Sequence, residues 1–297
     1  MNNQEEVVRI SAKHLGKIGG YSDQYDRDLL VRIPRYLNRE AYGIKEGSET
    51  FFGVDVWNAY EVSAITEKGL PVVGMMKIVY SSASKYHVES KSIKLYLNSF
   101  NMTKLGNTAQ ECIEIIKDRV ATDLTILLET KVEVEMFTTT PEREYEFEDY
   151  PRIQDLINLD EIEFTTYQSD EKQLTLELTG KKVLKVDIDF LRSNCRVTNQ
   201  PDFGNILIYI KGDNIPSVES LARYVVSHRQ VSHFHEEICE MVFIHLQKAF
   251  TPEELMVTCL YSRRGGLEIN PMRASHKHTM PTFFADPECK LKKTLKQ

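Results

Sequence analysis

The chain has 297 residues, of which 41% are hydrophobic and 27% charged, and its formal net charge is -7 at pH 7. These values are typical of a globular protein and give no reason to expect a large nucleic-acid surface. The five cysteines are widely scattered, without the short CxxC spacing of a zinc or redox site, so we expect reduced thiols in a cytoplasmic protein. No apolar run approaches the ~18–20 residues that a membrane helix needs, and we expect no secretory signal.

The first half is predicted to contain strands, then a long helix, then a further strand. Strands are expected at residues 72–80, 93–97 and 132–136. Between them, apolar residues recur at steps of three and four, which indicates an amphipathic helix: Ile113, Ile116, Val120, Leu124 and Leu127. Asn107 or Thr108 is expected to cap this helix.

The second half follows the same order. Strands are expected at residues 184–190, 206–210 and 255–261, and a helix where Ile238, Val242, Leu246 and Ala249 share one face. A faint internal repeat with an offset of 130 residues sets Pro71 and Gly74 opposite Pro201 and Gly204, and residues 88–90 opposite 218–220. We therefore predict an α+β architecture of two similar units, with helices covering an antiparallel sheet and a cleft between the units.

Three regions are expected along the chain. Residues 1–140 would form an N-terminal module, residues 141–182 an acidic linker region, and residues 183–297 a C-terminal module. The last region ends in a lysine-rich tail, which we expect to be a solvated, frayed end: Lys290, Lys292, Lys293 and Lys296.

Cys195 and Asp202 place a thiol and a carboxylate seven residues apart. The segment 199–204 between and around them is rich in turn formers, which can fold the carboxylate back toward the sulfur. A nucleophile beside a proton carrier is what covalent catalysis needs. The pattern alone leaves open a buried structural cysteine next to a polar turn.

Four segments, 89–100, 193–204, 234–236 and 261–271, together resemble NADPH-dependent 7-cyano-7-deazaguanine reductases. These are the nitrile reductases of queuosine biosynthesis, which modifies tRNA, and the likeness is greatest to their two-module form. It runs from about residue 25 to about residue 273. The resemblance implies two tandem tunnelling-fold modules, each an antiparallel sheet backed by long helices, with the active site formed between modules.

The resemblance also implies roles for ten residues. Cys195 would add to the nitrile carbon to give a covalent thioimide, Asp202 would give a proton to the nitrogen, and NADPH would supply two hydrides. Substrate binding is implied for Val88, Glu89, Ser90, His235 and Glu236. Cofactor binding is implied for Ser90, Lys91, Arg264 and Gly265.

These roles make demands on the surroundings of the reacting groups. Asp202 must hold a proton, so we expect burial to raise its pKa, and the Cys195 thiolate would be favoured by a nearby cation or helix N-terminus. Arg196 is adjacent to the thiol, but we expect it to form a structural salt bridge. Ile65 stands where the offset would place a second thiol, so one thiol site per chain is expected.

Two alternatives compete with the reductase. A zinc-dependent pterin cyclohydrolase-like enzyme would need ligands such as His233, His235 and Cys239, or His276 and His278, and we expect no metal. A non-catalytic base-binding module would keep Glu89 and Glu236 without needing the thiol. We expect a homodimer that binds a small deazaguanine base, with no direct nucleic-acid or membrane partner, and the residues fit NADPH or NADH.

Overall fold

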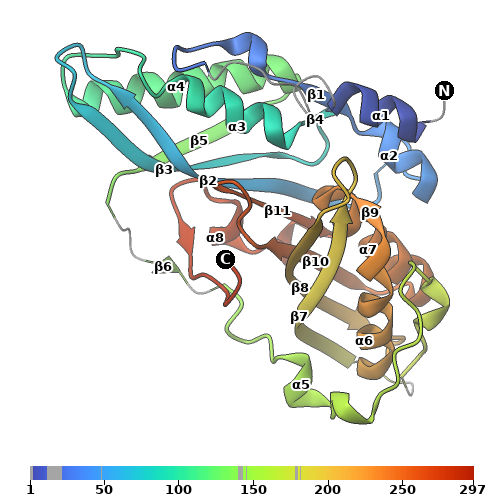
Figure 1. The fold of residues 1–297 in the computed structure, drawn as a ribbon. Helices are drawn as coiled ribbons and strands as arrows, with labels where there is room; N and C mark the ends of the chain where they lie inside the picture. The colour runs from blue at the N-terminus through green and yellow to red at the C-terminus, as the bar shows by residue number, and fades with distance from the viewer. Residues whose placement is uncertain are drawn as a thin grey trace.

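The structure is a computed structural model that describes residues 3–11, 22–47, 49–139, 143–144, 146–177, 180 and 182–297. An eight-stranded sheet with the order β5-β3-β2-β11-β10-β8-β7-β9 runs through the molecule (Figure 1). In chain order its strands are β2 (Phe52–Ile65), β3 (Pro71–Ser81), β5 (Val132–Phe137), β7 (Lys182–Cys195), β8 (Pro201–Gly212), β9 (Ser232–His233), β10 (Glu254–Tyr261) and β11 (Leu267–Ala274).

Among the described residues, four helices cover one face of this sheet, two in each half (Figure 1). They are α3 (Ser90–Ser99), α4 (Ala109–Leu128), α6 (Val218–Val226) and α7 (His235–Phe250). Smaller elements surround them: α1 (Asn3–Ser11), β1 (Arg32–Pro34), α2 (Tyr36–Arg39), β4 (Tyr86–Val88), β6 (Arg143–Glu144), α5 (Ile153–Leu156), α8 (Thr282–Ala285) and β12 (Lys290–Leu291). Six short 3-10 turns link them, at Arg27–Leu29, Glu40–Tyr42, Leu159–Glu161, Glu171–Gln173, Ser227–Gln230 and Lys277–Thr279.

The duplication predicted from the repeat is visible in the strands. The hairpin β2–β3 is repeated as β7–β8, and the first strand of each hairpin begins and ends 130 residues from its counterpart. Both hairpins also carry a register shift, between Ala59 and Val62 in one and between Ile188 and Leu191 in the other. Two helices and a further strand follow each hairpin. The α+β fold with two tandem modules is therefore confirmed.

The two modules share one sheet instead of forming two separate ones. β11 of the second module pairs antiparallel with β2 of the first, from Leu267 opposite Ala59 to Ala274 opposite Phe52. Two apolar cores lie under the helices, one for each module. Because the sheet is shared, the helices of the first module lie beside the helices of the second on the same face (Figure 1).

The strand predicted at residues 93–97 is wrong, because this segment is part of helix α3. Ile93, Tyr96, Leu97 and Phe100 are buried at the spacing of one helix face. The helix begins where the Glu89 side chain accepts hydrogen bonds from the backbone N–H groups of residues 91 and 92. The long helix α4 is as predicted, and Thr108, whose side chain accepts from the N–H of Glu111, is its cap.

A buried ion network ties the modules together next to the shared strands. Arg273 of β11 donates to Asp55 of β2 at 2.9 Å and to Glu240 of α7 at 2.8 Å. Asp55 also pairs with Arg35 at 2.5 Å, and Glu240 with Arg39 at 2.7 Å. Burial opposes ionisation of Glu240, but the arginines outweigh it and lower the pKa of this carboxyl to about 2.

The C-terminal segment does not fray as expected. It crosses the sheet face opposite the helices (Figure 1), where its Phe284 packs against residues of β2, β8 and β11. Lys77 of β3 donates to the carbonyl oxygens of residues 283, 286 and 289, at 3.2, 2.6 and 2.6 Å. Lys293 forms an ion pair with the fully buried Glu268. The expectation was wrong because Lys293 is held by a buried carboxylate and carbonyl oxygens of the segment are held by Lys77.

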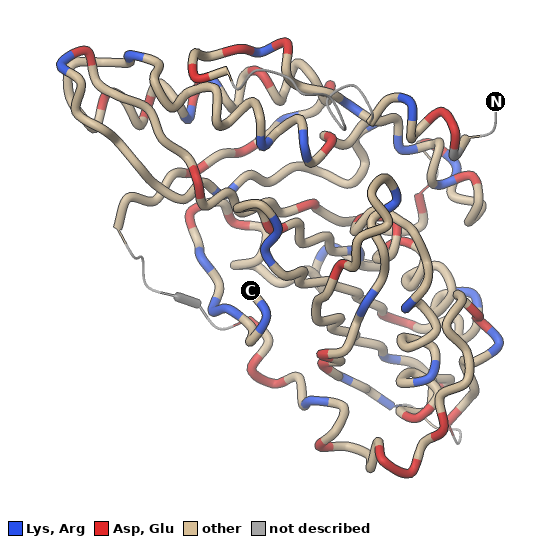
Figure 2. Tube along the Cα trace, viewed as in Figure 1, with Lys and Arg blue, Asp and Glu red and all other residues tan. Residues whose placement is uncertain are grey.

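Lys or Arg positions and Asp or Glu positions are interspersed along the described trace (Figure 2). No helix among the described residues is long and apolar enough to cross a membrane.

Candidate active site

A cavity of about 310 Å³ lies where the two modules meet, on the helical side of the sheet. Its lining comes from the β4–α3 junction of the first module, and from the β7–β8 hairpin, the start of α7 and the β10–β11 loop of the second. All ten residues singled out in the sequence line it: Val88, Glu89, Ser90, Lys91, Cys195, Asp202, His235, Glu236, Arg264 and Gly265. The sequence had indicated that both modules would contribute, and they do.

The β7–β8 hairpin brings the thiol and the carboxylate to the same face of the sheet. Cys195 ends β7, and its backbone N–H donates to the carbonyl of Gln200 at 2.8 Å. Asp202 stands opposite Ser193, two residues before the thiol, so Cys195 and Asp202 are diagonal neighbours, roughly 7–8 Å apart by their Cα atoms. The tight turn is at residues 196–199, where Asn199 has φ +54, and the segment 201–204 already belongs to β8.

Asp202 is buried and is contacted by a guanidinium group and an imidazole ring. Arg264 donates to one of its oxygens at 2.8 Å, and His235 Nε2 lies 3.4 Å from the other. Burial acts to raise the pKa of Asp202, but the hydrogen bond and charge of His235 and the charge of Arg264 outweigh burial and lower it. The expectation of a raised pKa is therefore wrong, because the neighbours of Asp202 stabilise the carboxylate.

His235 is the first residue of α7 and faces Asp202. Its ring stacks on the buried ring of Tyr261, with 3.6 Å between centroids and 6° between planes. Its Nδ1 is buried and has no hydrogen-bond partner within the described part of the chain. The stacking fixes the imidazole plane, so Nε2 is held toward the carboxylate of Asp202 while Nδ1 remains available.

Glu89 is buried at the start of helix α3. It is 2% exposed and caps α3, accepting from the N–H groups of Lys91 at 3.0 Å and Ser92 at 2.7 Å. Burial raises the pKa of the Glu89 carboxyl, although these backbone hydrogen bonds and the nearby His87 act against the rise. A carboxylate has about four acceptor sites, so capping leaves capacity for a ligand.

Glu236 and His87 form a second buried pair in the cavity wall. His87 Nδ1 lies 3.6 Å from Glu236 Oε1, and the two residues are 3% and 5% exposed. Glu236 Oε1 and His87 Nε2 are both buried without a hydrogen-bond partner in the described structure. His87 was not predicted as a site residue, because none of the motifs considered in the sequence includes it.

The residues expected to hold a cofactor lie at the mouth of the same cavity. Arg264 reaches Asp202, Thr198 and Gln200 across the opening. Gly265 has φ +58, a left-handed backbone conformation that favours glycine, and the Lys94 ammonium lies 2.8 Å from where a Cβ atom would be. Bare amide groups and cations at one opening are suited to phosphate groups.

Arg196 is confirmed as a structural residue. Its side chain is 8% exposed and pairs with Glu237 at 2.8 Å and with Asn38 at 2.5 Å. The cation therefore ties the hairpin turn to α7 and α2. No cation contact to the Cys195 sulfur is recorded among the described residues, so the expected activation of the thiolate stays a prediction.

The proposed zinc ligands point to different places. His235 faces Asp202, whereas Cys239 donates to the carbonyl oxygens of Val257 and Pro271 in the core. His233 Nδ1 lies 2.8 Å from Glu237. No group of three or more His, Cys, Asp or Glu side chains among the described residues is arranged to hold a metal ion, His276 and His278 included.

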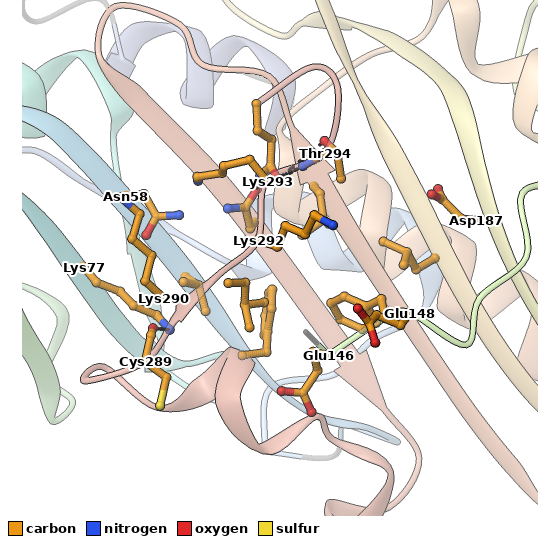
Figure 3. A pocket seen from close by; sticks show the side chains of 18 residues that line it. Asn58, Lys77, Glu146, Glu148, Asp187, Cys289, Lys290, Lys292, Lys293 and Thr294 are labelled. Atoms are coloured by element: carbon orange, nitrogen blue, oxygen red, sulfur yellow. Dashed lines mark hydrogen bonds between the residues drawn. The ribbon is translucent and has the colours of Figure 1, made fainter. Parts of the chain in front are cut away.

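A second cavity of about 230 Å³ lies on the opposite face of the sheet (Figure 3). Successive side chains of a strand point to opposite faces of the sheet, so neighbouring residues line different cavities. Val56 and Asn270 line this cavity, whereas Trp57 and Ile269 line the first. Lysines of the C-terminal segment and the carboxylates of Glu146, Glu148 and Asp187 surround it. None of the ten candidate residues belongs to it.

Comparison with known proteins assigns the chain to a family. Residues 21–136 match a family model described as the N-terminal part of the nitrile reductase 7-cyano-7-deazaguanine reductase, and residues 201–280 match one described as QueF-like protein. The two matches span most of the chain and divide between the two modules. The chain therefore belongs to the 7-cyano-7-deazaguanine reductase family, and it is an enzyme of the nitrile reductase type with a role in the queuosine pathway.

Among solved structures, the chain is similar to an archaeosine synthase QueF-Like in the apo form. It is 18% identical and covers 33% of this chain and 95% of its own, with a TM-score of 0.29.

Proposed function

We propose that the chain reduces the nitrile of 7-cyano-7-deazaguanine to the primary amine of 7-aminomethyl-7-deazaguanine, with NADPH as reductant and a thioimide as covalent intermediate. One observation carries the proposal. The thiol of Cys195, the Asp202–His235 pair and the buried carboxylates of Glu89 and Glu236 line a single cavity between the modules. The thiol of Cys195 and the carboxylate of Glu89 thus come from different modules and line the same cavity.

Cys195 begins the reaction. Its sulfur attacks the nitrile carbon, a carbon–sulfur bond forms, one π bond of the C≡N group breaks, and its electron pair takes a proton at nitrogen. The thioimide carbon accepts hydride more readily than the bare nitrile, so covalent capture divides a difficult step into easier ones. Two NADPH molecules, bound in turn, would supply the two hydrides that a four-electron reduction requires.

Asp202 and His235 would deliver the protons together. The Asp202 carboxylate is held in its ionised form while Arg264 and His235 contact it. Its conversion to a proton donor requires that a partner be drawn away or that the proton pass through His235. His235 is placed for this task, because Nε2 faces the carboxylate and Nδ1 has no partner among the described residues.

Glu236 and Glu89 would bind the base. A deazaguanine presents ring and amino N–H donors on one edge, and carboxylates accept such donors in pairs. Glu236 Oε1 lacks a partner in the described structure and gains one from such a ligand. Val88 and Ser90 flank Glu89 at the same cavity wall.

Ser90, Lys91, Arg264 and Gly265 would hold the phosphate groups of NADPH, since they place a hydroxyl, two cations and a backbone amide at the cavity mouth. We further propose that the protein is cytoplasmic and that its active species is a homodimer of two-module chains. Sedimentation of the purified protein would test the homodimer.

The test is covalent capture by the thiol. Mixing the protein with 7-cyano-7-deazaguanine should add the mass of one base per chain, and peptide mapping should locate it at Cys195. Cys195→Ala should lose both this adduct and NADPH consumption, whereas Cys289→Ala, a matched thiol outside the cavity, should lose neither. Asp202→Asn should still form the adduct while turnover at saturating base falls. Steady NADPH consumption by Cys195→Ala would end the covalent mechanism.

A further inference from the structure

His87 lies between the two carboxylates of the proposed base site. It occupies the middle of the short strand β4, opposite Ile33 of β1, and precedes Glu89 by two residues. Its Nδ1 is 3.6 Å from Glu236 Oε1, and its charge also acts on the Glu89 carboxyl. Phe234 packs edge-on against the imidazole, with 5.2 Å between ring centroids and 70° between planes. The ring is therefore held in place from two sides.

Two neighbouring buried atoms in this wall lack partners within the described structure, Nε2 of His87 and Oε1 of Glu236. Leaving a buried polar atom unpaired is costly, so such atoms in a cavity wall mark where a ligand completes the hydrogen bonding. The carboxylate oxygen can only accept. The imidazole donates from Nε2, either as the Nε2–H tautomer or when both nitrogens carry protons. The wall thus offers an acceptor and a donor from two neighbouring side chains.

An adjacent acceptor and donor are complementary to a lactam edge, in which a ring N–H stands next to a ring carbonyl. We propose that His87 is a specificity-determining residue whose Nε2–H donates to the ring carbonyl oxygen of the base while Glu236 accepts from the neighbouring ring N–H. This inference rests on the proposed function and adds the group that distinguishes a guanine-like edge from an adenine-like one. A 6-amino base would present a donor to the His87 donor and would leave the Glu236 carboxylate facing a ring nitrogen without a proton.

The test compares two ligands in one protein background. Cys195→Ala removes covalent capture, so equilibrium binding is measured by calorimetry for 7-cyano-7-deazaguanine and for the same cyano base lacking the ring carbonyl oxygen. We expect the parent to prefer the carbonyl-bearing base by about tenfold or more, since a single unmatched buried polar group costs that much. The base without this oxygen also lacks the adjacent ring N–H, so part of the preference comes from Glu236. Adding His87→Phe should therefore reduce the preference several-fold without abolishing it, and His87→Gln, which keeps an N–H donor, should retain more of it.

His245→Phe is the matched control, because this histidine lies 3.5 Å from Glu171 but does not line the cavity. It should leave the preference unchanged. The preference is a ratio within one sample, so a partly unfolded variant does not distort it, and His87→Gln supplies a second measurement should His87→Phe fail to fold. A His87→Phe protein that keeps the full preference would overturn the role of His87. Failure of the unmutated chain to bind or reduce either base would instead overturn the proposed function.

Discussion

Replacing Arg273 by Met is expected to destabilise the whole chain, because this one guanidinium holds both modules. It is fully buried and contacts Asp55 of the first module and Glu240 of the second, together with the carbonyl of Val54 at 3.2 Å. Methionine fills much of the volume but leaves both carboxylates short of a partner. Removing one partner from a buried ion pair typically costs about 3–5 kcal/mol.

The lower end of that range applies, since Asp55 keeps Arg35 and Glu240 keeps Arg39. A loss of about 3 kcal/mol is a large share of the roughly 5–15 kcal/mol by which proteins are stable. For a chain of this size each kcal/mol shifts the midpoint of thermal unfolding by about 2–4 °C, so we expect a decrease of roughly 6–12 °C.

Thermal unfolding followed by circular dichroism measures the effect, with Arg152→Met as the control. Arg152 also pairs with a carboxylate, Asp189, at 2.8 Å, but its side chain is 55% exposed. Exposed pairs contribute about 0–1 kcal/mol, so this control should shift the midpoint by about 4 °C or less. Equal small shifts in the two variants would refute the view that the buried network joins the modules.

Three further predictions follow from single contacts. Arg264→Gln removes a cation 2.8 Å from Asp202, so the pKa of that carboxyl should rise; because Asp202 must hold a proton to act as donor, the alkaline limb of the pH–rate profile should move to higher pH, and an unmoved limb would contradict the pairing. Burial lowers the pKa of Lys77 from 10.5 to about 8, so the folded state binds fewer protons than the unfolded state between these values. The native chain should therefore gain stability on going from pH 8 to pH 10, by up to about 1.4 kcal/mol per pH unit, and urea unfolding should find this gain missing in Lys77→Met. Thr108→Ala should cost about 1 kcal/mol in the same assay by removing the cap of α4, whereas Asn107→Ala should cost little.

The segments that the sequence predicted well are those in which one periodicity persists. The helical pattern from Ile113 to Leu124 extends over three turns, and α4 buries those positions. The offset of 130 residues matched β2 with β7 because the whole hairpin is repeated, with Ile65 in the place of Cys195. The candidate site followed from the resemblance, and the cavity brings its ten residues together.

Short windows were less informative. Residues 93–97 alternate apolar and polar side chains over five positions, as a strand would, and only the longer window to Phe100 reveals the helical spacing. The burial of Lys77 and Lys293 had no sequence signal, because their acceptors lie far along the chain or are backbone carbonyls.

The pKa of Asp202 was predicted in the wrong direction for a related reason. Burial of a carboxyl can be anticipated beside a predicted strand, but its charged neighbours cannot. His235 and Arg264 follow Asp202 by 33 and 62 positions, and tertiary structure alone brings them within 3.4 and 2.8 Å. His87 was not predicted as a site residue for the same reason, because its partner Glu236 belongs to the other module.

The pairing of β11 with β2 also constrains how the chain is made. β2 ends at Ile65, and its partner is complete only at Ala274, so at about 5–20 residues per second a ribosome leaves one edge of β2 uncovered for on the order of 10–40 s. An uncovered strand edge is a template for joining another polypeptide. Truncation before residue 267 would make that exposure permanent, and a nascent chain stalled there is expected to aggregate.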